Sequence, residues 1–411
     1  MVSVTRGAAK LAIVLVGLPA RGKTYTGRKL LRYLTWLGHR TRIFNVGEYR
    51  RARLGVWQPQ NFYDPDNAEA VELREELAAA ALVDMVDWLR EEGEVAIYDA
   101  TNSTRTRRDM LRAACEREDV DQLFVEMIGD DEELVERNIR RTKLKLFEYA
   151  GLDPEEAVSD FRQRIAHYAR VYENVEPDEG SFVRLGADRQ VSANDISGAM
   201  AKRVLRFLCK VRPVAPSVWL TRHGETVANI SGQIGGNPAL APRGERYALA
   251  LRSFVDRELE IDQEIVVWTS ALVRASRTGE LLGRPWTVWP ELNEIDAGVC
   301  EGMSYEEIRT AMPDEFTARK RDKFAYRYPR GESYGDLIRR VEPVVVEVED
   351  QTAPVLIVAH QAVLRVLYAY FKDIPREQCP HLTVPQHTVV RLEPRGDDYV
   401  ERHDPLVPTM G

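Results

Sequence analysis

Short apolar runs alternate with amphipathic segments along the first half of the chain. The runs with the length and β-branched content of buried strands cover residues 11–17, 41–46, 94–100 and 123–129. Segments with helical periodicity cover residues 67–92, 154–175 and 195–210. Because parallel strands need crossover connections, this alternation predicts a mainly parallel sheet with helices on both faces.

The pattern starts again after residues 211–217, a segment with two prolines that is the best candidate for a domain boundary. Further apolar runs cover residues 217–224, 264–270, 287–290 and 354–361, and helical segments cover residues 274–283, 304–312 and 361–371. We therefore expect two α/β domains, at residues 1–213 and 214–411. The length of 411 residues agrees, since it exceeds what one hydrophobic core usually serves.

Composition narrows the classes of function. With 44% hydrophobic and 30% charged residues and a net charge of −8, the chain reads as a globular protein that does not bind nucleic acid. Its four cysteines are scattered, which argues against a zinc site or a disulfide framework. The N-terminal apolar run is too short to span a bilayer, so we expect a cytoplasmic protein without membrane contact.

The sequence GLPARGKT, from Gly17 to Thr24, fits the pattern GxxxxGK[ST] between an apolar run and a helical segment. Glycines such as Gly17 and Gly22 let backbone N–H groups surround phosphate oxygens. In such a loop Lys23 reaches the β- and γ-phosphates of a nucleotide, and the Thr24 hydroxyl binds Mg²⁺. The motif therefore predicts a nucleotide-binding P-loop.

Asp99 ends the third apolar run, which predicts a carboxylate at the sheet edge beside the P-loop. There it could hold Mg²⁺ or accept a proton from an attacking hydroxyl group. Three arginines follow closely, Arg105, Arg107 and Arg108, and they are as readily explained by a solvated helix face.

The second half carries Arg222 and His223 at the end of its first apolar run. A neutral imidazole can attack a phosphoryl group when nearby cations neutralise the phosphoryl oxygens. Arg274 and His360 follow two other apolar runs and are expected at the same sheet edge. The set predicts a phosphohistidine chemistry with His223 as the nucleophile.

Phosphoryl transfer to His223 requires a proton for the departing alkoxide, and a carboxylic acid that stays protonated at neutral pH can supply it. Glu294 is the candidate. We expect its pKa to be raised by clustering with His360 or a bound phosphate. The same group would then activate water against the phosphohistidine.

The strings GLPARGKT, FNVGEYRR, NFYDPDN, YDATN and DFRQRIAHY follow one another over about residues 11–185. Together they resemble the kinase half of the 6-phosphofructo-2-kinase/fructose-2,6-bisphosphatase family, which implies a P-loop NTPase-like domain with ATP and Mg²⁺. The resemblance implies that ATP binding, Mg²⁺ binding and catalysis depend on the following residues: Gly17, Gly22, Lys23, Thr24, Asp99, Thr101, Asn138 and Lys143. It also implies that fructose 6-phosphate is bound by Arg50, Arg51, Arg74, Arg164 and Tyr168. The chain departs from the family pattern after Asn138, so Lys145 competes with Lys143.

The histidine pair resembles the histidine phosphatase superfamily, with its phosphoglycerate mutase-like α/β fold, over about residues 216–395. LNEIDAGVCEGMSYEEI, RYPRGESY and AHQAVLRVLYAYF are similar to the fructose-2,6-bisphosphatase half of the same family. The resemblance implies a phosphoryl-transfer pocket of Arg222, His223, Asn229, Arg274, Glu294 and His360. It implies that the rest of the substrate is held by Tyr305, Arg319, Lys323, Gln361 and Arg365. From the residues alone, the segment 304–307 is predicted to form a helix capping box. The basic segment 319–323 is explained equally well as a solvent-exposed face.

The two implied activities act on one metabolite, since the first makes fructose 2,6-bisphosphate from fructose 6-phosphate and the second hydrolyses it. We expect both to be active. The resemblance also implies a homodimer, whereas control by phosphorylation is not expected because the termini are short. Two alternatives stay open: a polynucleotide or small-metabolite kinase fused to a broad phosphatase, and a non-catalytic metabolite sensor.

Overall fold

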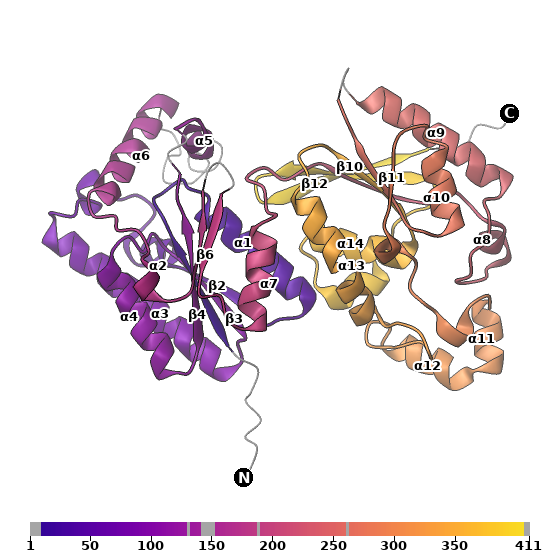
Figure 1. The fold of residues 1–411 in the computed structure, drawn as a ribbon, viewed down its shortest axis with the longest axis horizontal. Helices are drawn as coiled ribbons and strands as arrows, with labels where there is room; N and C mark the ends of the chain where they lie inside the picture. Colours follow the sequence, from indigo (N-terminus) through magenta and orange to yellow (C-terminus); the bar gives the residue numbers. More distant parts are fainter. Residues whose placement is uncertain (1–9, 130–131, 141–152, 187–189, 260–262, 407–411) are drawn as a thin grey trace, which may run out of the picture. The chain divides into compact units, whose positions relative to one another are not determined.

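The chain divides into two compact units, Met1–Cys209 and Lys210–Gly411, each built on its own six-stranded sheet (Figure 1). The structure is a computed structural model that describes residues 10–129, 132–140, 153–186, 190–259, 263–406. In this part of the chain, no helix has the length and apolar character needed to cross a membrane.

The sheet of the N-terminal unit has the order β2-β3-β1-β4-β5-β6. Its strands are β1 (Leu11–Val16), β2 (Thr41–Asn45), β3 (Val95–Asp99), β4 (Asp121–Met127), β5 (Phe182–Leu185) and β6 (Val191–Asn194). All neighbours pair in parallel except β5 and β6. The predicted mainly parallel sheet is confirmed, and β5 and β6 extend it beyond the predicted strands.

Helices cover both faces of this sheet (Figure 1). They are α1 (Lys23–Leu37), α2 (Val46–Leu54), α3 (Ala68–Glu91), α4 (Arg105–Arg117), α5 (Glu132–Asn138), α6 (Pro154–Ala169) and α7 (Ala199–Leu208), with single 3₁₀ turns at Gln60–Phe62 and Pro177–Glu179. Val14 of β1 shares a buried cluster with α3 and α4 side chains. Leu15, on the opposite face, lies against Gly27 of α1.

Two predicted helices are shorter than their periodicity suggested. The helix expected over 154–175 ends at Ala169. Its last predicted residues instead bond to other elements, because Glu173 N–H donates to the Ser103 carbonyl and Val175 N–H to the Glu126 carboxylate. The helix expected over 195–210 begins only after Gly198, whose φ of 78° is not helical.

The sheet of the C-terminal unit has the order β12-β11-β7-β10-β8-β9. Its strands are β7 (Val218–Arg222), β8 (Val266–Thr269), β9 (Thr287–Val288), β10 (Val355–Ala359), β11 (Thr388–Arg395) and β12 (Asp398–Pro405). The neighbouring strands β7, β10, β8 and β9 are parallel. In contrast, β11 runs antiparallel to both β7 and β12. The sequence did not predict the antiparallel edge.

The helices of this unit are α8 (Val227–Ser231), α9 (Pro242–Glu258), α10 (Val273–Glu280), α11 (Tyr305–Ala311), α12 (Pro313–Arg321), α13 (Tyr334–Glu349) and α14 (Gln361–Phe371). Single 3₁₀ segments lie at Pro290–Leu292, Gly298–Cys300 and Arg376–His381. Trp219 of β7 and Leu356 of β10 pack with Phe254 of α9 in one buried cluster. The helices α13 and α14 pack on each other and lie on the side of the sheet opposite to α9 (Figure 1).

Candidate functional sites

The loop after β1 has the backbone geometry of a phosphate cradle. Gly17 and Gly22 have φ angles of 139° and 86°, and a Cβ atom on Gly17 would lie 2.6 Å from the Met127 carbonyl oxygen. Helix α1 starts directly after Gly22 without a side-chain cap, so the N–H groups of its first turn face the loop. The Lys23 ammonium donates to the carbonyls of Gly17 and Leu18, both at 2.7 Å, and therefore lies over the same loop.

Asp99 lies where the sequence predicted it, at the end of β3 beside the P-loop. Its carboxylate is buried and accepts hydrogen bonds from the Thr24 hydroxyl at 2.9 Å and from the Asn45 side chain at 2.5 Å. Asn45 also caps α2 by accepting from Glu48 N–H. One asparagine therefore fixes the start of α2 relative to Asp99.

The loop after β3 is tied to the P-loop through its backbone, since Gly17 N–H donates to the Thr101 carbonyl at 3.0 Å. Asn138, at the end of α5, donates to the Ala20 carbonyl at 2.9 Å on the other side of the P-loop. The predicted residues Thr101 and Asn138 thus contact the phosphate cradle. Two candidates fall outside the described residues, Lys143 and its alternative Lys145.

A cluster of cations surrounds Tyr63, which the sequence did not single out. Arg50 donates to the Tyr63 hydroxyl, and the Arg164 guanidinium lies 4.0 Å from the centre of the Tyr63 ring. Arg74 donates to the Tyr63 carbonyl at 3.1 Å and lies over the ring of Tyr168 at 5.7 Å. The structure therefore brings Arg50, Arg74, Arg164 and Tyr168 together.

Several guanidinium groups around one ring repel one another, and an anion bound among them relieves the repulsion. Their planar donors suit phosphate oxygens. Arg51 lies next to Arg50 on α2 and is half-buried. Since Asn45 links α2 to Asp99, an anion held by Arg50 would lie on the same side of the domain as Asp99.

In the C-terminal unit, three neighbouring parallel strands end beside one another. His223 follows β7, His360 follows β10, and Ser270 follows β8. The two imidazole rings lie 5.0 Å apart between centres. Gly224 has to be a glycine, because a Cβ atom there would lie 2.3 Å from the Gly244 carbonyl oxygen.

Hydrogen bonds fix the tautomer of His223. Its Nδ1 donates to the Gly224 carbonyl at 2.7 Å, and its Nε2 accepts from Arg274 Nε at 3.1 Å. Burial and the nearby Arg274 lower the pKa of His223 to about 3. The ring is therefore neutral, with its lone pair on Nε2 beside a guanidinium group, which is the state that phosphoryl attack requires.

Ser270 sets the tautomer of His360. Its hydroxyl oxygen accepts from Leu272 N–H at 3.3 Å and lies 2.6 Å from His360 Nε2, and we infer that the hydroxyl donates to Nε2. Nδ1 then carries the ring proton, and this buried atom has no partner among the described residues. Burial, His223 and Arg274 hold the pKa of His360 well below its ordinary value. His360 is a neutral donor available to a ligand.

Arg222 and Glu294 complete this group. The buried Nε of Arg222 has no hydrogen-bond partner among the described residues, and burial lowers the pKa of its guanidinium. Glu294 accepts from Ile295 N–H at 2.9 Å and Ala362 N–H at 3.2 Å. The pKa of Glu294 is raised, as predicted, but by burial rather than by negative neighbours, because Arg222 and Arg274 act in the opposite direction.

A second set of cations lies further along the same unit. Arg319 donates to the hydroxyls of Tyr328 and Tyr305, at 2.8 and 2.9 Å, and stacks over the Tyr305 ring. Burial and the positive charges of Arg365 and Arg319 lower the pKa of Lys323 to about 8. The basic segment read as a possible solvated face is thus partly buried and contains mutually repelling cations, which favours an anion site.

The remaining candidates lie at the ends of helices. Asn229 forms a capping box with Thr226 at the start of α8 and accepts from Gln386 at 3.4 Å. Gln361 is the first residue of α14, directly after His360, and Arg365 lies one turn further along. The capping box expected at 304–307 is confirmed at the start of α11.

Glu294 also lines a cavity of about 390 Å³. Gly236, in the same lining, accepts from Arg274 Nη1 at 2.8 Å, so the cavity lies beside the His223 group. Arg340 holds this wall by donating to the backbone carbonyls of Asn293 and Glu294. No cluster of three or more His, Cys, Asp or Glu side chains suited to a metal ion occurs in the part of the chain that the structure describes.

Comparisons with known proteins match a different family to each of the two units. Residues 1–214 match the family model of 6-phosphofructo-2-kinase, and residues 218–403 match branch 1 of the histidine phosphatase superfamily. A chicken (Gallus gallus) 6-phosphofructo-2-kinase/fructose-2,6-bisphosphatase is 46% identical over 93% of this chain and 82% of its own length. The human form 3 is 43% identical over 93% of this chain and 74% of its own. An Arabidopsis thaliana relative of the same name is 47% identical over 93% of this chain, which spans 52% of that protein.

The chain therefore combines a P-loop kinase domain with a histidine phosphatase domain. It belongs to the bifunctional 6-phosphofructo-2-kinase/fructose-2,6-bisphosphatase family.

Removal of the Ser270 hydroxyl tests the assignment of the His360 tautomer. We expect Ser270→Ala to lower the phosphatase kcat roughly tenfold, equivalent to about 1.4 kcal/mol, because the ring loses the donor that keeps its proton on Nδ1. Phosphate release measures the rate, and ¹⁵N NMR reports the tautomer. Ser253→Ala, which removes an exposed hydroxyl on α9, is the matched control. A Ser270→Ala rate within twofold of wild type would contradict the assignment.

Acidification tests the burial of neutral His223. Since its folded pKa of about 3 lies below the unfolded value near 6.5, the unfolded chain binds more protons as pH falls through this window. The stability that neutral His223 contributes is complete above pH 6.5 and is lost as pH falls towards 3, by roughly 3 to 5 kcal/mol. Calorimetry of the C-terminal unit should show a shallower acid dependence in His223→Gln. Equal slopes in variant and wild type would refute the prediction.

Proposed function

We propose that the N-terminal unit transfers the γ-phosphoryl group of ATP to the 2-hydroxyl of fructose 6-phosphate, and that the C-terminal unit hydrolyses the resulting fructose 2,6-bisphosphate. The balance of the two reactions would set the level of this bisphosphate. Family membership supports both activities. The observation that carries the choice of substrate is the pair of cationic groups in the C-terminal unit, around His223 and around Arg319 and Lys323, since a sugar bisphosphate has two phosphates to hold.

In the kinase reaction, the P-loop N–H groups and Lys23 bind the nucleotide phosphates. Arg50, Arg74 and Arg164 hold the 6-phosphate of the sugar near Tyr63. Asp99 accepts the proton of the attacking 2-hydroxyl, and the γ-phosphoryl group leaves ADP for the sugar oxygen.

Mg²⁺ fits this site. The Thr24 hydroxyl and the Asp99 carboxylate lie within 2.9 Å of each other and are hard oxygen donors. Mg²⁺ is usually held by one or two such groups together with substrate phosphates and water, so a larger carboxylate cluster is not required. When bound, the ion neutralises negative charge on the phosphates.

In the phosphatase reaction, His223 Nε2 attacks the 2-phosphoryl group and the bond from phosphorus to the sugar oxygen breaks. Glu294, whose pKa is raised by burial, gives its proton to that oxygen and releases fructose 6-phosphate. Arg222, Arg274 and His360 Nδ1–H donate to the phosphoryl oxygens. Glu294 then takes a proton from water, whose oxygen attacks the phosphohistidine and restores His223.

A homodimer is inferred from the family resemblance alone, and a cytoplasmic location from the short N-terminal apolar run and the scattered cysteines. Light scattering on the purified chain tests the first, since a mass near 47 kDa, that of one chain, would exclude a dimer.

The proposed cycle predicts opposite effects for variants of the two sites. With Mg·ATP and fructose 6-phosphate, His223→Ala should accumulate more of an acid-labile sugar bisphosphate than wild type, because its breakdown falls at least about 100-fold. Asp99→Asn should form none but should still hydrolyse added fructose 2,6-bisphosphate. Absence of bisphosphate in wild type and His223→Ala alike, with labelling of a polynucleotide end instead, would replace this function by the alternative kinase.

A further inference from the structure

Arg108 differs from the arginines beside it on α4. Its side chain is fully buried, whereas those of Arg105, Arg107 and Arg112 are 43%, 12% and 32% exposed. The sequence left open that Arg105, Arg107 and Arg108 form a solvated helix face. For Arg108 that reading is wrong, and a buried guanidinium group needs a specific set of partners.

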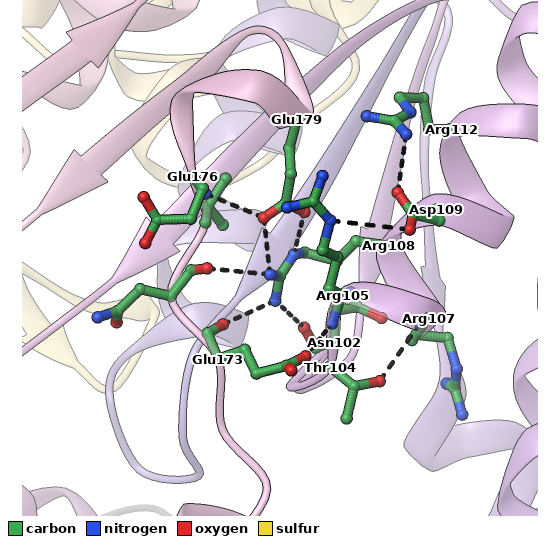
Figure 2. Close-up of polar contacts among 12 residues, drawn as sticks. Asn102, Thr104, Arg105, Arg107, Arg108, Asp109, Arg112, Glu173, Glu176 and Glu179 are labelled. Carbon is green, nitrogen blue, oxygen red and sulfur yellow. Dashed lines mark hydrogen bonds and ion pairs between the residues drawn. The ribbon is translucent and has the colours of Figure 1, made fainter.

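Every N–H group of Arg108 has an acceptor (Figure 2). Nε and Nη2 donate to the two carboxylate oxygens of Glu179, at 2.6 and 2.8 Å. The other three N–H groups reach backbone carbonyls, those of Asn102 at 3.2 Å, Glu173 at 2.8 Å and Asn174 at 3.0 Å. A guanidinium group has five donors, so Arg108 keeps none for a substrate.

One side of this arrangement is the loop after β3 that follows Asp99. Asn102 is buried with φ of 47°, and its side chain donates to the Leu15 carbonyl at 2.7 Å, one residue before the end of β1. Arg108 binds the Asn102 carbonyl from the other direction. The loop is therefore held between the strand that leads into the P-loop and the buried guanidinium.

The other side is the segment that follows α6. Glu179 accepts from Glu176 N–H at 2.9 Å (Figure 2). Glu173 N–H donates to the Ser103 carbonyl at 2.8 Å. Glu126 of β4, fully buried, binds the same segment through Tyr172 and Val175, at 2.8 and 3.1 Å. This segment starts only a few residues after α6 ends.

The two sides belong to different parts of the proposed kinase site. The loop after β3 directly follows Asp99 and carries Thr101, whereas α6 carries Arg164 and Tyr168. We propose that the Arg108–Glu179 pair is a positioning device, which joins the loop beside the nucleotide to the segment after the sugar-phosphate helix so that the acceptor hydroxyl meets the γ-phosphoryl group in line. This inference rests on the proposed kinase function.

Stability alone does not account for such a pair. A buried ion pair is often no more stabilising than apolar side chains of the same volume, whereas removal of one partner strands the other charge. Misplacement of reacting groups by about 1 Å, in contrast, costs roughly 100-fold in rate. The double variant Arg108→Met/Glu179→Leu removes both charges together and so separates positioning from folding.

The test is a comparison of kinase kcat and of KM for ATP in the full chain. We expect the double variant to lose kinase kcat by at least about tenfold with KM for ATP within threefold of wild type, because the P-loop itself is unchanged. Phosphatase activity, borne by the other unit, reports that the chain is intact. Arg117→Met changes an exposed arginine of α4 that donates to the Ala113 carbonyl of its own helix; it is the matched control and should behave as wild type.

A double variant with kinase kcat within tenfold of wild type, or with a matching rise in KM for ATP, overturns the proposal. If circular dichroism and calorimetry show that its N-terminal unit is unfolded, Arg108→Lys is judged by the same criterion, since lysine keeps the charge but supplies only three donors. Failure of the proposed kinase function is distinct, because it would appear in the wild-type chain itself as absence of sugar bisphosphate.

Discussion

Ionisable groups buried at the ends of parallel strands are the constraint on which both sites depend. Asp99, His223 and His360 are each at most 4% exposed, and each directly follows or ends an interior strand of its sheet. A charge in such a place is costly unless it has partners, so neighbouring residues dictate which groups carry protons. In the phosphatase half this forces two neutral imidazoles and a raised pKa for Glu294.

Positively charged side chains gather at two further places in the structure. Arg50 and Arg164 gather around Tyr63, and the charges of Arg365 and Arg319 lower the pKa of Lys323. Folding would not favour such groupings by themselves, whereas a phosphate ester bound among them offsets the repulsion. In the proposed function, these cationic groups are where the phosphates of the sugar substrates bind.

The parts that the sequence predicted are those encoded locally. A P-loop or an Arg-His-Gly turn lies within a few residues, and strand-terminal positions follow from apolar runs, so the predicted location of Asp99 at a strand end is confirmed. Tyr63, Asn45 and Ser270 were missed because each acts through partners that are distant in sequence. The helix over 154–175 was predicted too long because periodicity does not reveal that Glu126 and Ser103 bind its last residues. Arg108 could not be told from its exposed neighbours, since only the fold brings Glu179 to it.

The central claim is that His223 is neutral, has its lone pair on Nε2 and becomes phosphorylated during turnover. Rapid quenching of the chain with fructose 2,6-bisphosphate labelled at the 2-phosphate, followed by peptide mapping, tests it directly. The account predicts an acid-labile, base-stable phosphoryl group on Nε2 of His223 that disappears as labelled phosphate forms. Turnover of the substrate with no label on His223 at any time would contradict it.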